Sequence, residues 1–177
     1  MDMSAEPPES FGQFAGVPQP AELADTRYYW EDMTPGLRYV TATRTVTEAD
    51  VIAFAAYSGD WNRAHVDAEY AKGSLWGQRI AHGMLVGALM GGLNSRTVIN
   101  QLLEPSLLGL LEVTFKYPKP TLIGDTIAVT VEVVEQRETS NSTRGIVVYK
   151  RTAVNQRAET VAVCDAVMMV ARRGVNR

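Results

Sequence analysis

The sequence predicts an α+β fold in which an antiparallel sheet wraps around one long helix. One apolar segment near the middle of the chain, roughly 81–96, is long enough to form that helix. Segments rich in β-branched residues follow it, separated by turn signals, and one such segment precedes it. The order is therefore one strand, a helical middle and four further strands, which is typical of an α+β protein.

The first 25 residues differ in composition from the rest of the chain. They hold five acidic residues, no Lys or Arg, and four of the eight prolines. Such a segment lacks the apolar periodicity that a packed core needs. We therefore predict a disordered acidic tail over 1–25 and a single domain over 26–177.

The domain is predicted to begin with a turn, a strand and a helix. Pro35 and Gly36 indicate a turn, and Arg38–Val46 is β-branched and aromatic, as in a strand. Thr47 followed by Asp50 resembles a capping box, which predicts a helix over Glu48–Tyr57.

Two further helices are predicted in the middle of the chain. Asp67 can cap a short helix, Ala68–Lys72, and the long helix is expected over Ala81–Arg96. Glycines recur in the long helix at every fourth position, so they share one face; they are Gly83, Gly87 and Gly91. Each costs about 1 kcal/mol relative to Ala, which indicates that a sheet or a ligand approaches the helix backbone there.

Four strands are predicted after the long helix. Turn signals separate them, at Gly124-Asp125 and at the polar cluster 139–143, and Pro118 and Pro120 end the first. The predicted strands are Leu108–Tyr117, Thr126–Arg137, Arg144–Asn155 and Thr160–Ala171.

Composition excludes several classes of protein. A net charge of −3 argues against nucleic-acid binding, while 46% hydrophobic residues support a substantial core. The only cysteine, Cys164, lies in an apolar run and is predicted to be a core residue; without a second cysteine the chain forms no internal disulfide. No signal peptide or membrane span is apparent, so we expect a cytoplasmic protein that binds no membrane.

The segment from Tyr57 to Met84 carries the residues with the clearest chemistry. Both histidines of the chain, His65 and His82, lie in it, together with Asp60. A carboxylate and an imidazole placed around one water can act in general acid–base catalysis. Taken alone, Asp60 and Asn62 would most simply be turn residues that make local hydrogen bonds.

This segment resembles the MaoC-like dehydratases, which include the (R)-specific enoyl-CoA hydratases. The similarity rests on AFAAYSGDWNRAHVDAEYA, IAHGMLVGALM and FKYPKPTLIGDT, and it extends over about residues 30–171. It implies a hot-dog fold, a homodimer or a dimer of dimers, and an acyl-CoA that enters near the subunit interface. It also implies reversible addition of water across the C2–C3 double bond of an enoyl thioester.

The resemblance assigns roles to particular residues. Asp60 and His65 match the catalytic pair, Asn62 orients their loop, and the Gly83 N–H matches the donor to the thioester carbonyl. His82 would support this site by capping or bracing the helix. The chain departs from the family pattern at Arg63, where a proline is usual; Arg63 would leave the loop more mobile or reach a CoA phosphate or an acidic acyl group.

Further substrate contacts are predicted less directly. Gly91 would enlarge the acyl pocket, with Gly87 beside it. Trp61 and Trp76 would line a ligand pocket or, more simply, pack in the core. Three cations are candidate phosphate contacts or solvated surface charges, namely Arg79, Lys116 and Lys119.

We expect no cofactor other than the CoA of the substrate, and no metal site. Two histidines seventeen positions apart and one distant cysteine do not form a zinc-binding spacing. The expected activity is that of a hydro-lyase of fatty-acyl metabolism. Two alternatives remain open, a hot-dog thioesterase and a non-catalytic acyl-CoA-binding subunit.

Overall fold

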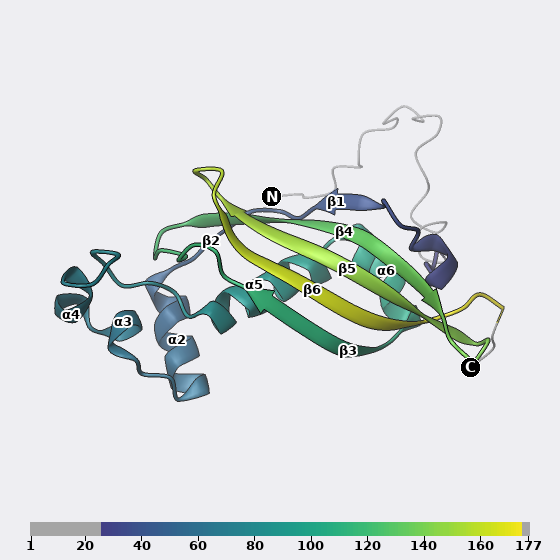
Figure 1. Cartoon of the computed structure of the whole chain (residues 1–177), viewed down its shortest axis with the longest axis horizontal. Coiled ribbons are helices and arrows are strands. Elements are labelled where there is room, and N and C mark those ends of the chain that lie inside the picture. The colour runs from purple at the N-terminus through teal and green to yellow at the C-terminus, as the bar shows by residue number, and fades with distance from the viewer. Residues whose placement is uncertain (1–25, 175–177) are drawn as a thin grey trace, which may run out of the picture.

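The computed structural model describes residues 26–174, so the predicted tail over 1–25 lies outside the described part. A curved antiparallel sheet lies over one central helix (Figure 1), which confirms the predicted α+β class and the hot-dog arrangement. The strands are β1 (Arg38–Val40), β2 (Arg44–Thr45), β3 (Leu107–Lys116), β4 (Thr126–Glu138), β5 (Arg144–Asn155) and β6 (Thr160–Ala171). Their order across the sheet is β1-β4-β5-β6-β3, and β2 also pairs with β4.

The helices lie mostly between β2 and β3 in the chain. The α-helices are α2 (Glu48–Ser58), α3 (Arg63–Val66), α4 (Ala68–Lys72), α5 (Gly83–Ser95) and α6 (Val98–Leu103), and the two 3₁₀ helices are η1 (Trp30–Asp32) and η2 (Glu104–Ser106). The central helix, α5, starts two residues later and ends one residue earlier than predicted. Helices α3 and α6 were not predicted. Among the described residues, no helix is long and apolar enough to cross a membrane.

The core lies between α5 and the concave face of the sheet. Alternate residues of β4 are buried, because successive side chains of a strand point to opposite faces. The valines of that strand and the apolar residues of α5 belong to one cluster, which includes Val129, Val131, Val133, Val86, Leu89, Met90 and Leu93. Cys164 of β6 is part of this cluster and is 1% exposed, which confirms its prediction as a core residue.

The prediction of one continuous strand over Arg38–Val46 is wrong, because this segment forms two short strands, β1 and β2. At Thr41 the side-chain hydroxyl accepts the hydrogen bond of the Val129 N–H at 3.0 Å. A side chain thus takes the place that a backbone carbonyl holds in a regular ladder. The two flanking segments still pair with β4.

Two of the three glycines of the repeat allow close contact with the edge strand β3. A Cβ at Gly87 would lie 2.8 Å from the ring of Phe115, and a Cβ at Gly83 would lie 3.0 Å from the ring of Tyr117. Aromatic rings of the sheet therefore fill the space in which side chains at Gly83 and Gly87 would lie. A Cβ at Gly91 would meet nothing within 4 Å.

Candidate active site

The end of α2 determines where Asp60 lies. The Thr47–Asp50 capping box begins this helix, as predicted. Gly59 ends it with φ of +76°, a left-handed conformation that favours glycine. The next residue, Asp60, is exposed, and its Oδ1 accepts a hydrogen bond from the Asn62 N–H at 3.2 Å.

Asn62 organises the loop that joins Asp60 to His65. Its Oδ1 accepts from the Ala64 N–H at 3.0 Å and so caps α3. Both Asp60 and Asn62 thus make the local turn hydrogen bonds expected of such residues. These bonds orient the loop and leave the other Asp60 carboxylate oxygen available.

His65 lies on α3 with one ring nitrogen engaged. Nδ1 lies 2.9 Å from the carbonyl oxygen of Ile80. Because a carbonyl oxygen only accepts, Nδ1 carries the proton, and Nε2 keeps its lone pair in the neutral ring. The fold therefore selects the tautomer in which Nε2 can act as a base.

His82 lies immediately before α5 and is only 2% exposed. Its Nε2 donates to the backbone carbonyl of Asp60 at 3.0 Å, so the ring braces the Asp60 loop rather than capping its own helix. The opposite nitrogen, Nδ1, is buried and has no hydrogen-bond partner within residues 26–174. The His65 and His82 rings lie 3.8 Å apart between centroids, with a tilt of 31°.

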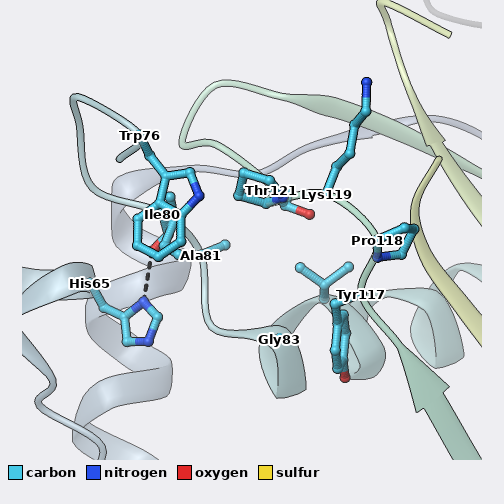
Figure 2. Close-up of a pocket in the computed structure, with 11 residues that line it drawn as sticks. His65, Trp76, Ile80, Ala81, Gly83, Tyr117, Pro118, Lys119 and Thr121 are labelled. Atoms are coloured by element: carbon cyan, nitrogen blue, oxygen red, sulfur yellow. Dashed lines mark hydrogen bonds between the residues drawn. The ribbon is translucent and has the colours of Figure 1, made fainter. Parts of the chain in front are cut away.

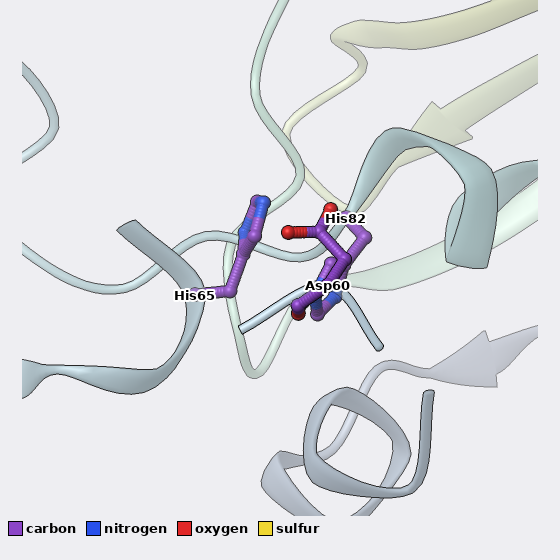
Figure 3. Close-up of side chains that lie close together, drawn as sticks. All are labelled: Asp60, His65 and His82. Atoms are coloured by element: carbon purple, nitrogen blue, oxygen red, sulfur yellow. The ribbon is translucent and has the colours of Figure 1, made fainter. Parts of the chain in front are cut away.

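Three segments therefore bring Asp60, His65 and His82 together (Figure 3). One carboxylate or ring-nitrogen atom from each residue lies within 4.8 Å of the others. Asp60 and His65 were predicted as a pair, whereas the hydrogen bond from the His82 ring back to the loop after α2 was not predicted.

A cavity of about 390 Å³ opens beside His65. Figure 2 shows Trp76 and Ile80 on one side of it, and Tyr117 and Pro118 on the other. Gly83, the first residue of α5, also lines the cavity, and the first N–H groups of a helix have no partner within the helix. The full lining set is His65, Trp76, Ile80, Ala81, Gly83, Val86, Tyr117, Pro118, Lys119, Pro120 and Thr121.

Four of the lining residues, from Tyr117 to Pro120, were not predicted as a wall of the site. The sequence predicted that the strand ends in this segment and that Lys119 is a candidate phosphate contact. Backbone bonding brings it to the site, since the Ala81 N–H donates to the Thr121 carbonyl at 2.8 Å and Ile80 bridges to Leu122. The glycine repeat is the one sequence feature connected with this wall, because Tyr117 packs closely against Gly83.

The cations near the site are mostly engaged in ion pairs. Arg63 bonds to Asp67 at 2.9 Å and lies 4.4 Å above the ring of Tyr70. Arg79 pairs with Glu48, and Lys119 with Glu159, each at 2.8 Å. Asp67 also caps α4 by accepting from the Tyr70 N–H, as predicted.

Trp61 and Trp76 do not pack in the core, so that interpretation of these two residues is wrong. Trp61 is 54% exposed and Trp76 is 39% exposed. Trp76 lines the cavity, which agrees with the alternative prediction that it lines a ligand pocket. Gly87 is covered by Phe115, which leaves Gly91 as the one glycine of the repeat with open space beside it.

Comparison with known proteins identifies the class to which this fold and site belong. The MaoC like domain matches residues 32–155, so the chain belongs to the MaoC-like family. An (R)-specific enoyl-CoA hydratase of Rhodospirillum rubrum is 32% identical over 152 residues, which cover 83% of this chain and 94% of that protein.

Two solved structures support this assignment. The MaoC-like dehydratase from Rhodospirillum rubrum has a TM-score of 0.71 and 28% identity, covering 84% of this chain and 99% of its own. A structure titled monoamine oxidase regulatory protein from Archaeoglobus fulgius has a TM-score of 0.78 and 31% identity, covering 82% and 95% of the two chains.

Proposed function

We propose that this chain hydrates enoyl-CoA thioesters reversibly, and dehydrates the corresponding 3-hydroxyacyl-CoA. The observation that carries the proposal is the placement of Asp60 within 4.8 Å of His65, which lines a cavity together with the first residue of α5, Gly83. The name of the Rhodospirillum rubrum relative, (R)-specific enoyl-CoA hydratase, supports it.

In the hydration direction, the thioester carbonyl would lie against the Gly83 N–H. The helix N-terminus favours the negative charge that develops on this oxygen. The missing side chain at Gly83, with Tyr117 packed at its Cβ position, leaves the backbone open to the cavity. This donor would stabilise the enolate that forms while water adds at C3.

A water molecule between the Asp60 carboxylate and His65 Nε2 would supply the hydroxyl. The water oxygen bonds to C3, one of its protons passes to the Asp60–His65 pair, and a proton from the pair is delivered to C2. Atoms and charge balance, so no cofactor is required. The hydrogen bond from His65 Nδ1–H to Ile80 keeps the ring in the tautomer that the step needs.

The first experiment is a spectrophotometric assay of crotonyl-CoA and of longer and branched enoyl-CoAs. Hydration removes the conjugated enoyl-thioester absorbance. We expect loss with wild type and with Asp165→Asn, a matched control whose carboxylate lies on the outer face of β6, and a much slower loss with Asp60→Asn. If folded wild-type protein is inactive across the whole panel, the proposal is wrong. Release of free thiol without hydrated product would instead indicate a thioesterase.

We further propose a homodimer that forms through β3. This strand lies at one edge of the sheet and is ten residues long. Its exposed apolar side chains include Leu110 at 56% and Leu111 at 52% exposure. A long apolar edge strand is a site for pairing with another strand. Light scattering during gel filtration should give twice the chain mass, 19.4 kDa; a monomeric mass would refute the dimer.

A cytoplasmic location also remains our proposal. It is supported by the single cysteine, Cys164, which leaves the chain without an internal disulfide. The substrate proposed here, an acyl-CoA thioester, belongs to the same compartment as a reduced thiol.

A further inference from the structure

We propose that Asp60, His65 and His82 also form a site for Zn²⁺, and that an ion bound there blocks the active site. The three residues offer two imidazole nitrogens and one carboxylate, all within 4.8 Å of one another. The site lies within one chain. Binding does not depend on the proposed hydratase activity, whereas inhibition does.

The hydrogen bonds around both histidines are those of metal ligands. His65 donates from Nδ1 to the Ile80 carbonyl, and His82 donates from Nε2 to the Asp60 carbonyl. A histidine that binds a metal through one nitrogen almost always donates its other N–H to a carbonyl or a carboxylate. Each ring here therefore retains one nitrogen with a lone pair, and its hydrogen bond selects the tautomer.

The His82 ring provides the second, independent observation. His82 is only 2% exposed, and its Nδ1 is fully buried. This nitrogen has no hydrogen-bond partner among the described residues. Buried polar atoms of this kind are rare, and each calls for a water, an ion or a chemical role. The catalytic scheme above uses His65 Nε2 and leaves His82 Nδ1 unused.

The donor set selects the type of ion. Imidazole and carboxylate ligands suit Zn²⁺, whereas Mg²⁺ and Ca²⁺ prefer all-oxygen sites. Zn–N bonds of about 2.0–2.1 Å require the ligand atoms to approach one another by an ångström or so. Asp60 is exposed, and its side chain accepts one hydrogen bond, so its carboxylate can turn towards the ion.

Zinc binding would have a defined effect on the reaction. The ion takes the lone pair of His65 and the free oxygen of Asp60, which are the groups that hold the water. It would also lie beside His65, which lines the cavity proposed to bind the substrate. We therefore expect inhibition that is competitive with enoyl-CoA and reversible with a chelator.

The experiment is a calorimetric titration of the full chain, free of any histidine tag, with Zn²⁺ and separately with Mg²⁺. The whole sequence contains two histidines and one cysteine, so few alternative sites exist. We expect one Zn²⁺ per chain and no Mg²⁺ binding. Asp60→Asn, His65→Ala and His82→Asn should each weaken Zn²⁺ binding by about tenfold or more. Cys164→Ser is the matched control and should leave the affinity unchanged.

Two further measurements keep the proposal testable if a variant fails to fold. Thermal unfolding without zinc identifies such a variant, and Asp60→Asn then carries the test because Asp60 is exposed. Unchanged Zn²⁺ affinity in folded Asp60→Asn and His65→Ala, or no binding at about 1 mM Zn²⁺, would overturn the site. If zinc binds but the hydratase rate is unaffected, the proposed inhibition is wrong and the zinc site stands. If zinc binds to a chain that has no hydratase activity, the site is supported and the proposed function is not.

Discussion

Two aspartates of this protein lie in polar clusters and are bonded in opposite ways. Asp125 is 2% exposed and accepts hydrogen bonds from Arg157 at 2.7 and 3.1 Å, from the Leu122 N–H at 3.0 Å and from Gln156 at 3.1 Å. Asp60 is exposed and accepts one bond from its own loop.

The difference separates a structural carboxylate from a reactive one. Every oxygen of Asp125 is engaged, so nothing remains for a ligand, and the cluster holds the turn before β4 to the β5–β6 turn. Within the described part of the chain, one carboxylate oxygen of Asp60 accepts no hydrogen bond, and a buried nitrogen of the neighbouring His82 has no partner. A cluster that satisfies all its members stabilises the fold, while one that leaves lone pairs unused is suited to chemistry.

The largest effect that tests this comparison is on turnover. Asp60→Asn should lower kcat by about 10²–10⁴-fold, because it removes one member of an acid–base pair. Its free energy of unfolding should change by less than about 0.5 kcal/mol, as for other exposed positions. Enoyl-CoA hydration and urea unfolding measure the two quantities. A stability loss as large as that of Asp125→Asn would contradict the distinction.

A substitution in the Asp125 cluster should have the opposite effect, lowering stability without lowering turnover. Arg157→Met leaves a buried carboxylate without its cation, so we expect the free energy of unfolding to fall by about 1.5–3 kcal/mol. The matched control, Arg137→Met, breaks an exposed pair with Glu135 and should cost less than about 1 kcal/mol. Both variants should retain wild-type kcat under conditions where they are folded. A large loss of kcat in Arg157→Met would show that the two clusters are coupled.

The same carboxylate predicts how stability depends on pH. Burial raises the pKa of Asp125, but hydrogen bonds from Arg157, Leu122 and Gln156 outweigh it and hold the pKa below the ordinary value of 3.8. A lowered folded-state pKa means that the ionised form stabilises the fold above about pH 3.8, and that this stabilisation is lost as the pH falls through the folded-state pKa.

Thermal unfolding of wild type and Asp125→Asn between neutral and acidic pH checks this sign. The gap in Tm between the two proteins should be widest above about pH 4 and should narrow as the solution is acidified. A gap that stays constant down to acidic pH would mean that Asp125 is not held ionised by its neighbours.

The sequence predicted the fold well where the signal was local and periodic. The capping box at Thr47, the cap at Asp67 and the strands from Arg144 and Thr160 needed no information beyond neighbouring residues. It predicted Asp60 and His65 through a motif, and the fold places them together.

Tertiary bonding accounts for the features that were missed. The break at Thr41 depends on a hydroxyl that meets Val129, far away in the chain. The unpaired nitrogen of His82 follows from a ring that turns back to the Asp60 carbonyl, and the wall at Tyr117 depends on how closely β3 approaches α5. None of these has a periodic or compositional signature.

The smallest predicted effect concerns Arg63, which replaces the proline usual in the family. Arg63 is the first residue of α3, where proline is well tolerated because its missing N–H would have no helical partner. Asn62 has ψ of 133°, the extended conformation that a following proline requires. Arg63→Pro would lose an exposed ion pair worth about 0.3–0.5 kcal/mol and gain about 0.4–1 kcal/mol by restricting the unfolded chain.

These opposing terms predict a Tm within a few degrees of wild type and an unchanged kcat for Arg63→Pro. The KM for enoyl-CoA is the informative measurement. The Arg63 side chain is bonded to Asp67 and stacked on Tyr70, so we expect KM to be unchanged as well. A rise in KM of about tenfold, with kcat intact, would instead mean that Arg63 leaves these partners to bind the substrate. The polar residues that flank Asp60 would then contact the ligand too, rather than only holding the loop in place.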